Sequence, residues 1–142
     1  MVLRSEPASA AIIPTQDAWL KHLTDRSHHD AVRTSTSEVA ATLQELFGQR
    51  LVAFMTGVDD PKAVGRWARR ERTPRDQTEQ RLRDAFQIAR LLTMADSADT
   101  ARAWFIGMNP HFANRAPFAV LGEEPESAPR VLAAAKAFIA GS

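Results

Sequence analysis

The residues of this chain whose types and spacing suit a chemical task lie near its middle. Residues 57–74 read GVDDPKAVGRWARRERTP. Asp60 can cap a helix that has Pro61 at its first position and runs to about Arg70. Because an α-helix turns by about 100° per residue, the side chains of this stretch fall on two different faces. One face is apolar, with Val64, Trp67 and Ala68, and the other is cationic. The pattern predicts contacts with an anionic surface through Lys62, Arg66, Arg69, Arg70, Arg72 and Arg75.

The distribution of charge along the chain points to the same stretch. The formal net charge is only +1, yet residues 49–90 hold ten Lys and Arg against six Asp and Glu. A cationic helix with another helix packed behind it is the layout of a helix-turn-helix recognition helix, so DNA is the expected anion. Two alternatives stay open: the arginines form a solvated face, or they bind acidic residues of a neighbouring subunit.

Catalytic chemistry is not expected from this sequence. It contains no Gly-rich phosphate loop, no His-Glu-x-x-His, no Gly-x-Ser-x-Gly and no cysteine. The His28, His29 and Asp30 cluster lacks a further ligand at helical spacing, so a solvated loop is favoured over a metal site. His111 has no nucleophile or orienting carboxylate beside it, which favours a rim contact over a general base. We therefore expect a protein that is not an enzyme and needs no cofactor or metal.

The helices that must position these residues can be predicted from capping residues and apolar periodicity. A helix is expected from Gln16 to about Arg26, with Trp19, Leu20 and Leu23 on its buried side, followed by a polar loop over residues 27–36. Ser35 and Glu38 have the spacing of a capping box for a helix that Gly48 ends. A third helix covers residues 49–56 and ends at Gly57.

The longest helix is expected after the cationic stretch. Thr73 and Asp76 have capping-box spacing with Pro74 at the first helical position, and the helix should run to about Ala95. Its apolar residues form one continuous stripe that widens toward the end, which predicts burial on two sides. The residues concerned are Leu82, Ala85, Phe86, Ile88, Ala89, Leu91, Leu92 and Met94.

The last third of the chain, from Ser97 to Gly141, predicts a small helical module. Ser97 can cap a helix with Ala98, Ala101, Trp104, Phe105 and Met108 on one side, and the turn at Asn109 and Pro110 ends it. Pro117 should open a short turn closed by Gly122, and Ser127 should cap a final helix that Gly141 ends. This final helix presents Val131, Leu132, Ala135, Phe138 and Ile139 on one face. The apolar residues exceed what so short a segment needs for its own core, so a partner is expected to dock here.

This module resembles the toxin-binding domain of the MbcA/ParS/Xre antitoxins. The resemblance covers roughly residues 45–142 and depends on Arg102 to Phe105, Met108 to Pro110, Arg115 with Pro117 and Leu121, Val131 with Leu132, and Ala137 with Phe138. The central unit is similar to the Xre-type helix-turn-helix in Gln49, Leu51, Gly57 and Val58, Val64, Trp67, and Thr73 with Pro74. It differs in a segment from Val58 to Val64 that is one residue longer and in Arg70, which stands where a glycine is usual.

The resemblance implies a function and a partner. The chain would be the antitoxin of a type II toxin-antitoxin system whose C-terminal end covers the NAD pocket of a RES-domain toxin, so that inhibition is steric. It would also bind its own operator and form a homodimer within a larger hetero-oligomer. The implied toxin contacts are Trp104, Phe105, Met108, Asn109, Pro110, His111, Phe112, Phe138, Ile139 and Ser142.

Two other functions fit the same residues. The first is a dimeric DNA-binding regulator whose C-terminal module only self-associates. The second is an adaptor that binds a protein other than a toxin. In each case we expect an all-α cytoplasmic protein without a membrane span, divided into residues 1–35 (arm and first helix), 36–95 (helix-turn-helix unit) and 96–142 (toxin-binding domain). The largely buried residues should include Leu51, Trp67, Phe86, Leu92, Trp104 and Leu132.

Overall fold

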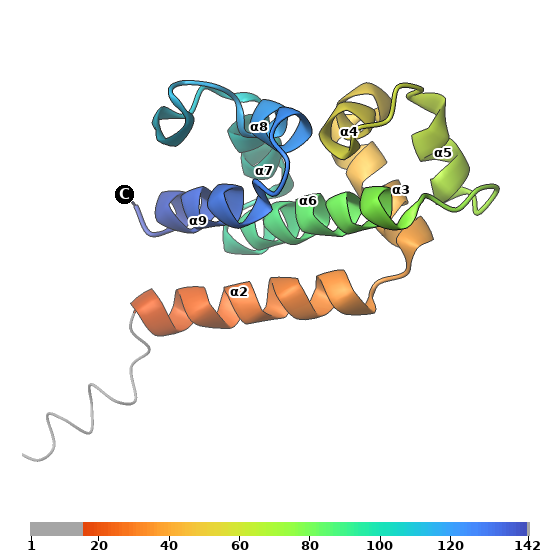
Figure 1. The fold of residues 1–142 in the computed structure, drawn as a ribbon. Coiled ribbons are helices and arrows are strands. Elements are labelled where there is room, and N and C mark those ends of the chain that lie inside the picture. The colour runs from red at the N-terminus through yellow and green to blue at the C-terminus, as the bar shows by residue number, and fades with distance from the viewer. Residues whose placement is uncertain (1–15, 142) are drawn as a thin grey trace, which may run out of the picture.

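The fold is all-helical over residues 16–141, the part of the chain that the computed structural model describes (Figure 1). Its only β-type pairing in that part is an isolated antiparallel bridge between Asn109 and Arg115. The elements are α2 (Gln16–Arg33), α3 (Thr36–Phe47), α4 (Gln49–Thr56), α5 (Lys62–Ala68), α6 (Asp76–Ala95), α7 (Ala98–Ile106), the 3-10 turn η2 (Pro110–Phe112), α8 (Pro117–Glu123) and α9 (Ala128–Ile139). The expected arm over residues 1–14 lies outside the described residues.

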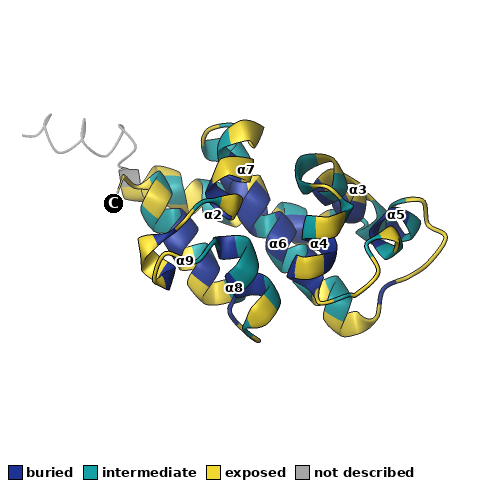
Figure 2. Ribbon diagram, turned by 90° about the horizontal axis from the view of Figure 1, so that it is seen from above, coloured by how far each residue is buried: buried dark blue, intermediate teal, exposed yellow. Residues whose placement is uncertain are grey.

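The 20-residue helix α6 lies at the centre of the fold, as its wide apolar stripe predicts. In Figure 1, α2 runs along one side of α6, and α4, α7 and α8 lie on the other. Helix α6 packs against α2, α3, α4, α7 and α9, and α8 packs against α4, α7 and α9. Seen from above in Figure 2, the buried residues gather where these helices meet and exposed residues follow the rim. Met94 of the predicted stripe is half-buried. The other apolar residues of the stripe are buried, and they are Leu82, Ala85, Phe86, Ile88, Ala89, Leu91 and Leu92.

The helix ends follow the predicted capping residues in most places. The Ser35 hydroxyl accepts from the Glu38 N–H (3.2 Å) and donates to the Glu38 carboxylate (3.0 Å), and the Ser97 hydroxyl accepts from the Thr100 N–H (3.1 Å). Gly48 ends α3, and Gly57 ends α4 with φ of +79°. Each cap satisfies backbone groups that a helix end leaves without a partner.

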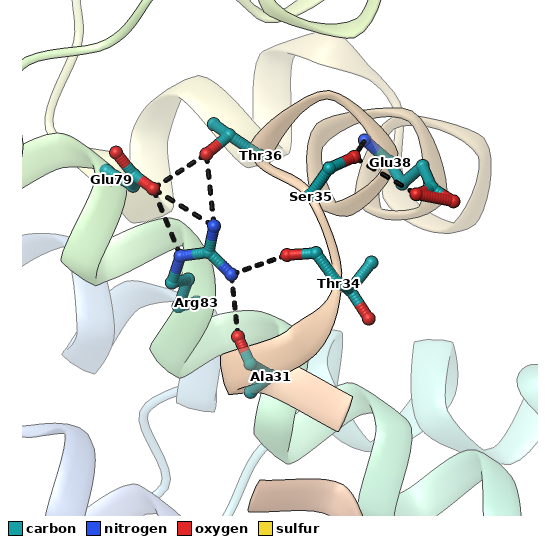
Figure 3. Close-up of polar contacts among 7 residues, drawn as sticks. All are labelled: Ala31, Thr34, Ser35, Thr36, Glu38, Glu79 and Arg83. Carbon is teal, nitrogen blue, oxygen red and sulfur yellow. Dashed lines mark hydrogen bonds and ion pairs between the residues drawn. The ribbon is translucent and has the colours of Figure 1, made fainter. Parts of the chain in front are cut away.

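One arginine ties the α2–α3 corner to α6 (Figure 3). Arg83 Nη1 donates to the backbone oxygens of Ala31 and Thr34, both at 2.7 Å. Its Nε and Nη2 donate to Glu79, and Nη2 also reaches the Thr36 hydroxyl, which itself donates to Glu79 at 2.6 Å. The Thr36 hydroxyl, together with Arg83, holds the pKa of Glu79 below its usual value, so this clamp keeps its charge at neutral pH.

The first helix was predicted wrongly in two respects. Residues 27–33 were expected in a loop, but α2 continues through them to Arg33. The tertiary contacts explain the longer helix, because Ser27 and Ala31 are buried and Asp30 pairs with Arg90 at 2.9 Å. Trp19 was expected to be buried and is 41% exposed, while Leu20 and Leu23 are half-buried.

Several other boundaries also differ from the predictions. Helix α5 ends at Ala68, and α6 begins at Asp76 without the expected capping box, so Thr73 and Pro74 belong to the extended connection. Gly122 lies inside α8 and does not close it. Ser127 stands at the start of α9, but its hydroxyl donates to the Val120 oxygen (3.1 Å) instead of capping. Of the six expected core residues, Leu51 and Leu132 are only half-buried; the other four are buried.

Gly122 gives the first testable prediction. A Cβ atom at this position would lie 2.5 Å from the Phe54 backbone oxygen and 2.8 Å from its ring, so α4 and α8 touch with no room for a side chain. We expect Gly122→Ala to lower the free energy of unfolding by about 2 kcal/mol through overpacking. Denaturant titration measures it, with Ala133→Ser on the exposed side of α9 as a control expected within about 0.5 kcal/mol of wild type. An unchanged midpoint for Gly122→Ala would mean that the helices are not in this contact.

Arg83 gives the second prediction. Arg83→Met keeps most of the apolar stem but leaves the Ala31 and Thr34 oxygens without this donor and leaves Glu79 with only the Thr36 hydroxyl, which should cost about 2 kcal/mol. Arg90 is the matched control, because it also joins α6 to α2 but through one partly exposed ion pair to Asp30. Arg90→Met should therefore cost less than about 1 kcal/mol. Equal losses for the two variants, measured by urea unfolding, would contradict a special role for the Arg83 clamp.

Candidate functional site

The six predicted DNA contacts lie together at one end of the fold. Helix α5 packs against α3 and α4, with Val64 and Trp67 buried, and this packing turns its polar side outward. The Asp60 carboxylate accepts from the Lys62 N–H at 3.0 Å at the start of the helix. Lys62, Arg69, Arg70, Arg72 and Arg75 are exposed, and Arg66 is half-buried. Figure 1 shows α5 and its connection to α6 at the end of the molecule where α6 begins.

Internal ion pairs divide these cations into two groups. Arg66 pairs with Asp60 at 3.2 Å, and Arg69 pairs with Glu71 at 2.7 Å. Hydrogen bonding to Arg69 holds the pKa of Glu71 below its usual value. Among the described residues, the remaining cations of this end have no ion pair, and they are Lys62, Arg70, Arg72 and Arg75. These four are free to meet an external anion.

The backbone at Arg70 has the conformation that glycine adopts most easily. Its φ is +64°, which lies in the left-handed region. The Glu71 N–H bonds back to the Arg66 oxygen at 2.8 Å, and the Arg70 N–H bonds to the Trp67 oxygen at 3.1 Å. The chain thus leaves α5 sharply and enters the extended segment that carries Arg72 and Arg75.

A groove of about 810 Å³ lies between this segment, the end of α4 and the first turns of α6. Sequence analysis missed one of its arginines, Arg81, which lies against Gly57 so closely that a Cβ there would be 2.5 Å from Arg81 Nη1. The groove also carries acidic residues, so its charge is mixed. Its charged lining residues are Arg66, Arg72, Arg75, Arg81, Asp59, Asp60, Asp84 and Glu126. Burial raises the pKa of Asp84 above its usual value.

A second, smaller pocket lies at the other end of the fold, where α7, η2 and the end of α9 meet. It measures about 200 Å³, and its lining is mostly apolar: Ala103, Trp104, Gly107, Met108, Asn109, Pro110, His111, Ala134 and Phe138. The Trp104 and Phe138 rings lie 6.5 Å apart between centroids. Six of the residues implied by the antitoxin resemblance thus line one pocket, although they come from segments some 30 positions apart.

The rim of this pocket exposes large apolar side chains. Met108 is 81% exposed and Phe138 is 45% exposed. Ile106 lies between Trp104 and Met108 in the sequence and is 51% exposed, but it does not line the pocket and was not among the predicted contacts. We refer to the exposed Met108 and Phe138, together with the largely buried Trp104 ring between them and the core, as the apolar rim.

Three of the predicted contacts within the described residues lie elsewhere. Phe105 is fully buried, and its ring packs on Phe47 at 4.7 Å between centroids. Phe112 is buried beneath the Arg130 guanidinium, which lies 5.6 Å from its ring centroid. Ile139 is half-buried against the core, and Ser142 lies outside the described residues. Phe105 and Phe112 therefore support the pocket from below and are not accessible to a partner.

Asn109 fixes the shape of the turn beneath the rim. Its side-chain oxygen accepts from the His111 N–H at 2.9 Å, and its backbone oxygen accepts from the N–H groups of Phe112 and Asn114. Arg115 then bonds to Glu123 and Glu124 and fastens the turn to α8. Asn109 is buried and its side-chain and backbone oxygens are occupied by these bonds, so it fixes the turn that shapes the pocket.

The described residues were expected to hold no metal site at His28, His29 and Asp30. Between residues 16 and 141, no group of three or more His, Cys, Asp or Glu side chains is placed to hold a metal ion. His28 and His29 lie exposed on α2. None of the helices in this part of the chain has the length and apolar character that crossing a membrane requires.

Comparisons of this chain with protein family models, curated proteins and solved structures find no match. The functional assignment therefore depends on the two surfaces themselves.

The division of the cations gives a prediction for DNA binding. Replacing the unpaired Arg72 and Arg75 by alanine should weaken binding to a duplex from the region upstream of the gene and lower the salt dependence, log Kd against log salt, by about 2. Arg26→Ala/Lys136→Ala is the control, since it removes the same charge from unpaired side chains of α2 and α9. A control that lowers affinity equally would mean that DNA responds only to net charge.

Proposed function

We propose that this chain is the antitoxin of a type II toxin-antitoxin system, which binds a toxin through the apolar rim and binds the DNA of its own operon through the cationic end. The observation that carries the proposal is the clustering of Trp104, Met108, Pro110, His111 and Phe138 around one pocket. The sequence resemblance to a toxin-binding domain implies the same five residues as contacts. Their convergence is what a common binding surface requires.

The physical character of the rim supports a protein partner. Two large apolar side chains of the pocket, Met108 and Phe138, are exposed side by side around a hollow, which is the kind of surface that a partner covers. A pocket of about 200 Å³ suits one or two apolar side chains of a partner and is small for most cofactors. Trp104 and Phe138 are the type of residue that contributes most binding energy at such interfaces.

The proposed inhibition is steric. The resemblance implies a RES-domain toxin that acts on NAD, and the end of α9 would cover its NAD pocket. Helix α9 stops at Ile139, and the Gly141 N–H bonds to the Phe138 oxygen at 3.1 Å, so the last turn holds Phe138 in place beside the rim. The proposed mechanism needs no catalytic group.

The proposed DNA binding regulates the operon. It is supported by the unpaired Lys62, Arg70, Arg72 and Arg75, which lie on α5 and on the segment that follows it. Phosphate neutralisation by such side chains supplies most of the affinity of non-specific DNA binding. The acidic residues in the adjacent groove, among them Asp59 and Asp84, favour binding along the exposed arginines over binding deep in the groove.

Co-expression with the neighbouring gene tests the proposal. We expect the neighbour alone to arrest growth and this chain to restore it, whereas Phe138→Ser should restore growth poorly because a rim contact worth about 2 kcal/mol is lost. Val32→Ser is the matched control, since Val32 is also an exposed apolar residue but lies on α2. Thermal unfolding should show both variants folded.

Two outcomes would reject the proposal. A neighbour that does not arrest growth, together with a chain that binds DNA as a self-associated dimer, would favour the transcriptional regulator. Full protection by Phe138→Ser would move the inhibitory contact away from the rim.

A further inference from the structure

We propose that Met108 is a peroxide-sensitive modification site and that its oxidation to the sulfoxide closes the apolar rim to its partner. Met108 is 81% exposed and lines the pocket beside Trp104 and Phe138. The effect on the partner rests on the function proposed above. The site itself does not, because it follows from exposure and chemistry alone.

The structure makes Met108 the preferred target among the described methionines. Met55 is 1% exposed in the core, and Met94 is half-buried on α6. The chain contains no cysteine, so no thiol competes for the oxidant. Oxidation of methionine follows access to the sulfur, and Met108 is the described thioether that solvent reaches freely.

The reaction requires only hydrogen peroxide and balances as an oxygen-atom transfer. The thioether sulfur of Met108 attacks one peroxide oxygen, an S–O bond forms, the O–O bond breaks and water leaves. The sulfur loses two electrons and the peroxide is reduced by two. Methionine sulfoxide reductases return the residue to the thioether, so the change is reversible in a cell.

The product would change the rim from apolar to polar at the point where a partner must exclude water. A sulfoxide oxygen is a strong hydrogen-bond acceptor, and covering it without a donor is costly. The possible donors in the pocket lining are the Asn109 side-chain NH2, the Trp104 indole N–H and the His111 ring. Even where one of them bonds the sulfoxide oxygen, a partner that covers the rim must still displace the water around this oxygen beside the Trp104 and Phe138 rings. Oxidation should therefore weaken docking while leaving the core intact.

The first experiment maps the site. Trypsin separates the described methionines into the peptides 51–62, 91–102 and 103–115, and Met1 into residues 1–4. After brief treatment of the folded protein with hydrogen peroxide, we expect the mass increase of one oxygen to appear in 103–115 at least about ten times faster than in 51–62. Similar rates in the three peptides from the described part would overturn the assignment of Met108 as the preferred site.

The second experiment measures the effect on binding to the purified product of the neighbouring gene. Peroxide should lower the affinity of wild type and of Met94→Leu about tenfold, because the added polar group must be desolvated. Met108→Leu, which keeps an apolar side chain of similar size, should bind normally and resist the treatment. Untreated Met108→Gln should bind as weakly as the oxidised wild type.

Three results are decisive. If treated Met108→Leu loses affinity as wild type does, the damage lies at another residue and the proposal fails. If oxidised wild type binds as tightly as before, Met108 is modified but controls nothing. If the untreated wild type does not bind the neighbouring product at all, the proposed function fails and the control of docking falls with it, while the peptide mapping still decides whether Met108 is the preferred site.

Discussion

The burial of α6 on two sides is the constraint on which the rest of the fold depends. Its apolar residues cover too wide an arc for one neighbour, so α2 packs along it and α3, α4, α7 and α9 cover the rest of the stripe, with α8 packed on α4, α7 and α9. The Arg83 clamp fixes where α2 ends and α3 begins, because it satisfies the last carbonyls of α2 and the side chain of Thr36 together. With both sides of α6 covered, its two ends become fixed positions, and each carries one of the candidate surfaces.

Most of the fold could be predicted from the sequence because its signals are local. Ser35, Ser97 and Gly57 act at the helix ends they were expected to mark, and the stripe of α6 is buried almost as a whole. The errors occurred where distant contacts outweigh local preference. The polar residues 27–33 show no apolar periodicity, yet the contacts of Asp30 with Arg90 and of Arg83 with Ala31 hold them helical. At Thr73 the possible capping box is not used, since the sharp exit at Arg70 leads into an extended segment with Pro74 buried.

The candidate site was less predictable because the spacing of residues along the sequence does not show which side chains are exposed to solvent. Trp104, Phe105 and Phe112 are equally aromatic in the sequence, but only Trp104 reaches the pocket, while the other two fill the core beneath it. The arginines of the cationic end also look alike in the sequence but differ in their ion pairs. Arg66 and Arg69 pair with carboxylates six and two positions away, whereas Arg72 and Arg75 have no such pair. The sequence shows that Asp60 and Glu71 lie close to several arginines, but only the structure shows which arginine forms an ion pair with each of them.

The length of α6 has a consequence for gene control. Its 20 residues span about 30 Å at the usual rise of an α-helix, and Figure 1 shows α5 at one end and the end of α9 at the other. If both proposals hold, a partner on the rim does not obstruct DNA at the far end, and operator occupancy follows the total amount of this protein, whether free or in complex. Feedback of that kind responds to the total concentration of this protein and not to the fraction that is free of toxin. Degradation of the protein would therefore derepress the operon, but binding of excess toxin would not.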